Sequence, residues 1–265
     1  MSKNILLTSG CSWTDEKFYS IDSSVPEDKR GGWPMWPELI SSDLNLKSYN
    51  LAKSGSDNKT IFDGIIDFLY KNNNVKTVIV IWSGWDRYKT MGFLDHYPIA
   101  SLMMDELDEF NVYKKLYKMD SYSDFFKSCS KNDLNVYVRD VIDSTLRYIY
   151  LLSSILEEEK INYIFFQGVT PFPINISSDI PDMVSYDNHD LLKSFSESIY
   201  HSFIKKNKSI FGYPFFNFLG GKRIQQLTGG NTNLEISELD THPNAEGQKV
   251  ITKFIMGKYN DLYSV

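Results

Sequence analysis

The chain has 265 residues, of which 42% are hydrophobic and 23% charged, and it carries a formal net charge of −6. This length suits one large domain with a sizeable core, and the composition is that of an ordinary globular protein. The acidic balance, with a pI of about 5.3, argues against a nucleic-acid partner.

The sequence also bears on the cellular compartment. Its two cysteines, Cys11 and Cys129, are too few for a disulfide framework and predict a reducing environment. The first residues lack the apolar core and cleavage site of a secretory signal. No apolar run approaches the roughly 18 residues of a membrane span. We therefore expect a single domain over residues 1–265, located in the cytoplasm and without membrane contact.

Strand-like and helix-like segments alternate along the chain. Strands are predicted at residues 5–8, 48–51, 75–82, 163–167 and 214–218, and helices at 36–44, 58–70, 133–159, 190–206 and 245–263. Continuous apolar runs at 78–81 and 163–166 are typical of strands buried on both faces of a parallel sheet. The alternation predicts an α/β fold with ligands at the carboxyl ends of the strands. Residues 90–130 show no regular pattern, and we expect them to form an insertion or a lid.

Three residue types that serve together in serine catalysis stand in the loops of this predicted fold. Ser12 follows the first predicted strand, and Asp240 and His242 precede the last helix. A serine nucleophile needs a base to take its proton and a carboxylate to orient that base. Taken singly, Ser12 could instead be a helix N-cap, and the Asp240–His242 segment could be a turn that caps the final helix.

Two further loops follow predicted strands. Gly55 lies in a tight loop before a helix, where backbone N–H groups can receive a developing oxyanion. The alternative is an ordinary turn that needs glycine for its backbone conformation. Gly84-Trp85-Asp86-Arg87 follows the apolar strand at 75–82.

In this order, the four segments resemble the blocks of the SGNH, or GDSL-like, hydrolase family. The resemblance implies a flavodoxin-like three-layer α/β/α sandwich with a central parallel sheet. It implies Ser12 as nucleophile, with Gly55 and Asp86 at the positions of the oxyanion donors beside the N–H of Ser12 itself, and His242 as base. The segment Ser12-Trp13-Thr14 also resembles a small subset of this family that has Ser-Trp-Thr at the nucleophile. Proteins of that subset are often encoded by phages and by bacterial gene clusters for surface sugars.

Two departures from the family pattern concern the chemistry. Asp86 stands where the family has asparagine, and an ionised carboxylate accepts hydrogen bonds but cannot donate one to an oxyanion. The family's acid lies three residues before the histidine, where this chain has Leu239. Asp240 lies two residues before His242 and Glu238 lies four before it. We expect Asp240 to be the acid, with Glu238 as the alternative.

Tryptophans are concentrated near these blocks. We expect Trp13, Trp33, Trp36 and Trp85 to form an aromatic wall at the substrate site, with Arg87 and Asn58 also binding substrate. The simpler alternative is that the tryptophans pack the junction between the sheet and its loops.

The sequence therefore predicts a serine esterase that removes an acetyl group from a sugar or another small acylated molecule. The catalytic set is Ser12, His242 and Asp240, and neither a cofactor nor a metal is expected. Two alternatives use the same fold: a module without activity that binds glycans or assembles a virion or cell surface, and an O-acyltransferase. The acyl group, the alcohol and the oligomeric state do not follow from the sequence.

Overall fold

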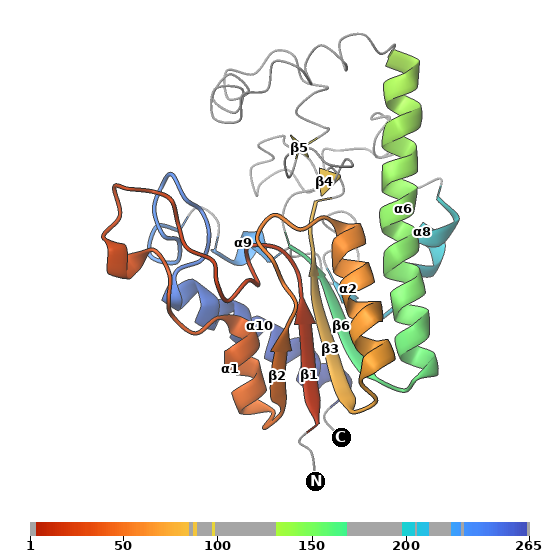
Figure 1. Cartoon of the computed structure of the whole chain (residues 1–265), viewed down its shortest axis with the longest axis horizontal. Coiled ribbons are helices and arrows are strands. Elements are labelled where there is room, and N and C mark those ends of the chain that lie inside the picture. The colour runs from red at the N-terminus through yellow and green to blue at the C-terminus, as the bar shows by residue number, and fades with distance from the viewer. Residues whose placement is uncertain are drawn as a thin grey trace.

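The core of the protein is a parallel sheet of five strands (Figure 1). In this computed structural model the described residues are 4–84, 87–88, 97–98, 131–168, 198–204, 206–211, 224–228 and 231–263. The strands are β1 (Ile5–Ser9), β2 (Lys47–Asn50), β3 (Val75–Trp82), β6 (Asn162–Gln167) and β7 (Ile210–Phe211), in the spatial order β2-β1-β3-β6-β7. Counted along the chain this is the flavodoxin-like order 2-1-3-4-5, a doubly wound sheet.

Helices cover both faces of this sheet. On one face lie α1 (Trp36–Asp43) and α10 (Ala245–Tyr263), and on the other α2 (Asn58–Lys71) and α6 (Lys131–Glu158). Successive strand residues point to opposite faces, so Ile79 and Ile81 pack toward α1 and α10 while Val78 and Val80 pack toward α2 and α6. The expected three-layer α/β/α sandwich is thereby confirmed.

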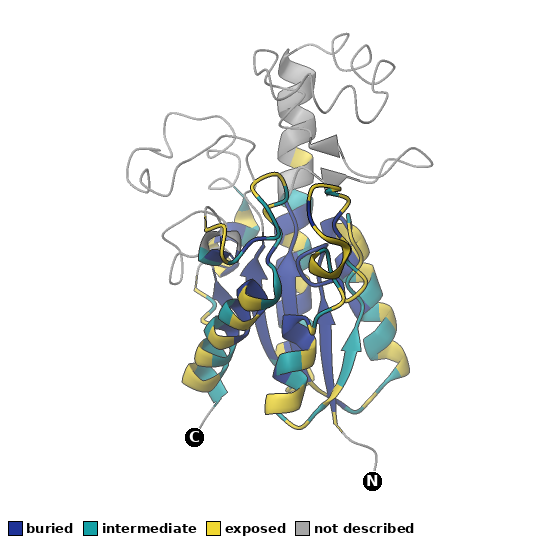
Figure 2. Cartoon of the chain, turned by 90° about the vertical axis from the view of Figure 1, so that its left-hand side faces the viewer, coloured by how far each residue is buried: buried dark blue, intermediate teal, exposed yellow. Residues whose placement is uncertain are grey.

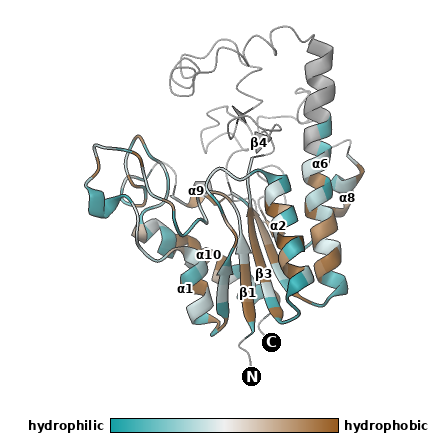
Figure 3. Cartoon of the chain, in the orientation of Figure 1, coloured by the Kyte–Doolittle hydropathy of each residue, from teal (hydrophilic) through white to brown (hydrophobic). Residues whose placement is uncertain are grey.

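The burial pattern explains why the apolar runs predicted strands. All residues of β3 from Thr77 to Trp82 are buried, because a central strand of such a sandwich has no solvent face. Figure 2 shows the buried strands between helices whose outward faces are exposed. Figure 3 shows the same division as apolar strands and amphipathic helices, the pattern expected of surface helices on a core.

The remaining described elements are short. They are a 3₁₀ turn η1 (Glu27–Lys29), helices α8 (Ile199–Ile204) and α9 (Gln225–Thr228), and a separate antiparallel pair β4 (Arg87–Tyr88) and β5 (Tyr97–Pro98). None of the helices in the described part of the chain is long and apolar enough to cross a membrane.

Three of the predicted segments are described by the structure only in part or not at all. The strand predicted at 214–218 lies outside the described residues. The last described strand of the sheet is Ile210–Phe211, where no strand was predicted. A strand of only two residues carries too little periodicity to be found from sequence. The helix predicted at 190–206 is described as α8, Ile199–Ile204. Of the insertion expected at 90–130, only 97–98 is described.

Candidate active site

The candidate site lies where the winding of the sheet reverses. From β1 the chain moves outward to β2 on one side and later to β3, β6 and β7 on the other. Ser12 follows β1, the Gly55 loop follows β2 and Ser83 follows β3. The carboxyl ends of these parallel strands meet at one edge, which is the position of ligands in open α/β sheets.

At this edge Ser12, His242 and Asp240 form a continuous chain of hydrogen bonds. Ser12 Oγ lies 2.7 Å from His242 Nε2, and His242 Nδ1 lies 2.6 Å from Asp240 Oδ1. Ser12 comes from the amino-terminal end of the chain and the other two residues from the loop before α10, so only the folded sheet brings them together. In this geometry Nε2 can accept the proton of the hydroxyl while the carboxylate orients the ring.

A local turn explains how an acid two residues before the histidine can reach it. Asp240 Oδ1 also accepts a hydrogen bond from the backbone N–H of His242 at 3.1 Å. This is an Asx turn, in which a carboxylate bonds the backbone two residues further on. The turn brings the same oxygen to the ring nitrogen Nδ1. Glu238, the alternative acid, is exposed.

The surroundings of Asp240 keep it ionised. Partial burial acts to raise its pKa, but hydrogen bonds from His242 and from the Ser20 hydroxyl outweigh this effect and lower the pKa to about 2. A carboxylate that is charged at neutral pH stabilises the imidazolium that forms when the histidine takes a proton.

The loop of Gly55 is tied to the segment that follows Ser12 by a buried carboxylate, that of Asp15. Asp15 Oδ2 accepts hydrogen bonds from the N–H and the Oγ of Ser54, each at 2.7 Å. Gly55 itself has a φ of +79°, a conformation that favours glycine. Among the described residues, none accepts a hydrogen bond from the backbone N–H of Ser12 or of Gly55.

Several residues expected to bind substrate have other contacts. Asn58 is buried, its Oδ1 accepts from Ser83 N at 2.9 Å, and its Nδ2 donates to Ser83 O at 3.1 Å. Asn58 thus fastens the loop after β3 to the start of α2, and it is not among the residues that line the cleft.

Three of the four tryptophans expected at the substrate site are described, and none of these three is among the residues that line the cleft. Trp36 is fully buried in the core between α1 and α10, and its Nε1 donates to Trp13 O at 3.2 Å. Trp13 is also buried, but its ring lies 5.7 Å from that of His242. Trp33 is only partly exposed and is not among the residues that line the cleft. Trp85 and Asp86 lie outside the described residues, as does the side chain of Arg87.

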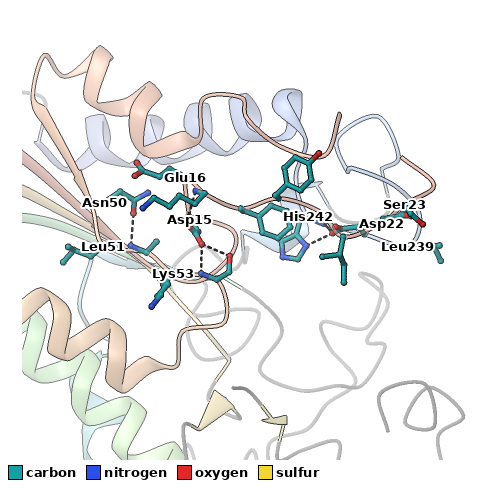
Figure 4. A pocket seen from close by; sticks show the side chains of 16 residues that line it. Asp15, Glu16, Asp22, Ser23, Asn50, Leu51, Lys53, Leu239 and His242 are labelled. Carbon is teal, nitrogen blue, oxygen red and sulfur yellow. Dashed lines mark hydrogen bonds and ion pairs between the residues drawn. The ribbon is translucent and has the colours of Figure 1, made fainter. Parts of the chain in front are cut away.

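A cleft bordered by Asp240 and His242 has a volume of about 1120 Å³ (Figure 4). Half of its lining comes from the segment after the nucleophile, with the rest from the loop after β2 and the loop before α10: Asp15, Glu16, Lys17, Phe18, Tyr19, Ile21, Asp22, Ser23, Asn50, Leu51, Ala52, Lys53, Ser54, Leu239, Asp240 and His242. Sequence reasoning missed the 15–23 segment, because its residues show neither helical nor strand periodicity.

The described residues contain no group of three or more His, Cys, Asp or Glu side chains that could hold a metal ion. A doubly wound α/β/α sandwich with a Ser–His–Asp chain at its switch point has the architecture and the side chains of a serine hydrolase.

Comparison with solved structures finds matches that span most of the chain. They include TesA (12% identity, covering 97% of this chain and 99% of that one, TM-score 0.45). Another is a protein from Parabacteroides merdae described as GDSL-like lipase (13% identity, 98% and 96%, TM-score 0.42). A third is a variant of Axe2, an acetyl xylan esterase from Geobacillus stearothermophilus (14% identity, 97% and 95%, TM-score 0.38). No protein-family model matches the sequence, and no curated protein matches it.

Proposed function

We propose that this protein is an ester hydrolase of the SGNH type. The observation that supports this most strongly is the pair of hydrogen bonds through His242, 2.7 Å to Ser12 Oγ and 2.6 Å to Asp240 Oδ1. Two bonds of this length, formed by the two ring nitrogens of one histidine, are what proton transfer from a serine nucleophile requires.

In the proposed reaction, Ser12 Oγ attacks the ester carbonyl carbon while His242 Nε2 takes the hydroxyl proton. The N–H groups of Ser12 and Gly55 stabilise the oxyanion of the tetrahedral intermediate. His242 then returns the proton to the leaving alcohol, which departs and leaves an acyl-enzyme on Ser12. Water, deprotonated by His242, attacks the carbonyl carbon of this acyl group; the bond to Ser12 Oγ then breaks, His242 returns the proton to Oγ, and the carboxylic acid is released. Asp240 holds the ring and its positive charge throughout.

The finer proposal is that the substrate is an O-acetylated sugar or a similarly small acylated molecule. The cleft beside His242 is open, and its lining includes the aromatic residues Phe18 and Tyr19 together with the charged residues Glu16, Lys17 and Lys53. Sugar rings present both apolar faces and hydroxyl groups, and pockets that bind such ligands combine aromatic surface with a few polar groups.

Labelling with a fluorophosphonate tests the reaction class directly, because the probe reacts with an activated serine. We expect wild-type protein and Ser24→Ala, a change at an exposed serine, to be labelled alike, and Ser12→Ala to be unlabelled and inactive on p-nitrophenyl acetate. Labelling that persists in Ser12→Ala would contradict the proposal. A wild-type protein that neither reacts with the probe nor cleaves esters would instead support the glycan-binding module without activity.

Acetate release from acetylated oligosaccharides, compared with hydrolysis of p-nitrophenyl octanoate, tests the finer proposal. We expect the acetylated sugar to have the higher kcat/KM. Transfer of the acetyl group to an added sugar in preference to water would identify an O-acyltransferase with the same triad.

A further inference from the structure

The carboxylate of Asp240 is held from two sides. Its Oδ1 accepts hydrogen bonds from the ring and the backbone of His242. Its Oδ2 accepts a hydrogen bond from the hydroxyl of Ser20, which is only 1% exposed and lies 220 residues away in the chain. Each oxygen of the acid therefore has its own partner, and the second partner is a buried side chain that the proposed reaction leaves unused.

The Ser20 hydroxyl is itself fixed in direction. The backbone N–H of Ser20 donates to Arg30 O at 2.9 Å, and the adjacent Tyr19 forms a β-bridge with Gly31. Ser20 Oγ accepts a hydrogen bond from the N–H of Asp22 at 3.2 Å. Because that contact occupies a lone pair, the one hydroxyl proton is directed at Asp240.

A second tie joins the same two segments. Ser237 Oγ donates to Asp22 Oδ2 at 2.5 Å and accepts from the N–H of Asp240 at 2.9 Å. We call residues 18–22 the strap, because they connect to the Asp240 loop through Ser20 and through Asp22. The strap also carries Phe18, which is stacked on His242.

We propose that Ser20 is a positioning residue of the triad, which holds the Asp240 carboxylate in the one orientation that serves His242. This inference rests on the proposed function. An acid that reaches its histidine through a two-residue Asx turn can still rotate about its last side-chain bond, and such rotation would move Oδ1 away from Nδ1. The hydroxyl proton on Oδ2 opposes that rotation and favours the charged form of the carboxylate.

The test compares Ser20→Ala with Ser20→Thr, which retains the hydroxyl, and with Ser24→Ala, an exposed serine whose side chain contacts Asp22 and not Asp240. We expect kcat on p-nitrophenyl acetate to fall about 10-fold to 100-fold in Ser20→Ala, by analogy with the loss of outer-shell partners at metal sites, while KM changes less than about twofold. Ser20→Thr should recover most of the kcat, and Ser24→Ala should match the wild type.

A second readout does not depend on turnover. The proton on His242 Nδ1 gives a downfield NMR resonance when it is bonded to a carboxylate, and we expect Ser20→Ala to shift or broaden it. If Ser20→Ala does not fold, Ser20→Cys carries the same test, because a thiol fills the site but is a weak donor.

An unchanged kcat together with an unchanged Nδ1 resonance in the alanine or cysteine variant would overturn the role of Ser20. A wild-type protein that lacks esterase activity but shows the Nδ1 resonance, with its shift in Ser20→Ala, would overturn the proposed function and leave the positioning of Asp240 by Ser20 standing.

Discussion

The phenyl ring of Phe18 is stacked on the imidazole of His242, with ring centroids 4.2 Å apart and planes inclined by 27°. The ring of Trp13 approaches the same imidazole at 5.7 Å. Both aromatic rings follow Ser12 within six residues, so one short segment supplies the candidate nucleophile and the surface against which its base lies. An aromatic face attracts a cation, and the base becomes an imidazolium during the proposed reaction.

The stacking predicts that Phe18 supports the base. Phe18→Ala should lower kcat on p-nitrophenyl acetate about 2-fold to 10-fold, because an aromatic pair contributes about 0.5–1.5 kcal/mol beyond area burial and about 1.4 kcal/mol corresponds to tenfold. Phe18→Leu keeps an apolar side chain but has no π-face, so its kcat should lie between those of the wild type and Phe18→Ala. A wild-type kcat in Phe18→Ala, measured at saturating substrate, would contradict this role.

The Asx turn at Asp240 predicts which carboxylate is the acid. Asp240→Asn should lower kcat by up to about 10⁴, the loss seen when the orienting acid of a triad is replaced by its amide. Glu238→Gln is the matched control, since Glu238 is exposed, and its kcat should stay within about twofold of wild type. Comparable losses in the two variants would show that the loop rearranges during turnover.

The pKa of Asp240 predicts how stability depends on pH. Its pKa is lowered from 3.8 to about 2 in the folded protein. The carboxylate therefore stabilises the fold above about pH 4, and this contribution, on the order of 2 kcal/mol, is lost as the pH falls through about 2. Urea unfolding at pH 2, 3, 4 and 6 should show the free energy of unfolding of the wild type falling toward that of Asp240→Asn across this window. A difference between the two proteins that stays constant with pH would contradict the prediction.

The hydrogen bonds of the buried Asp15 carboxylate to Ser54 predict that Asp15 holds the Gly55 loop in place. In Asp15→Asn the side chain keeps its shape but has one acceptor oxygen where the carboxylate has two, so either the Ser54 or the Lys17 N–H loses its partner. We expect kcat to fall at least about tenfold, toward the 10²–10³ that loss of an oxyanion donor costs, with the secondary structure intact by circular dichroism. Lys59→Ala, at an exposed position on α2, should behave as wild type. An unchanged kcat in Asp15→Asn would show that this carboxylate does not position the Gly55 loop for oxyanion stabilisation.

Close packing around Gly10 predicts that no side chain can be accommodated at this position, two residues before Ser12. A Cβ at Gly10 would lie 2.9 Å from the backbone oxygen of Ile81 and 2.5 Å from Thr14 Oγ1. The strand oxygen cannot move aside, so Gly10→Ala should lower the free energy of unfolding by about 1–3 kcal/mol and displace Ser12. Gly64→Ala on α2 has open space around the added Cβ and should be neutral or stabilise by up to about 1 kcal/mol. Equal thermal midpoints for the two variants would contradict the close approach.

Much of the fold followed from the sequence, because the signals concerned are local. The apolar runs at 78–81 and 163–166 marked strands buried on both faces, and they lie in β3 and β6. Ser12, Gly55 and His242 stand beside predicted strand ends or helix starts, so a parallel sheet brings them to one edge whatever the details of the loops. The three-layer sandwich could be predicted on the same grounds.

The supporting contacts were decided by the tertiary structure alone. Whether Asp240 or Glu238 meets the imidazole depends on an Asx turn, which residue spacing does not determine. The hydrogen bond from Ser20 joins segments 220 residues apart, and the strap that carries it has no periodicity to reveal its place. Asn58, by contrast, was expected to bind substrate. In the folded protein the start of α2 lies against the end of β3, and Asn58 is buried there. A buried amide needs hydrogen-bond partners, and Asn58 finds them in the backbone of Ser83.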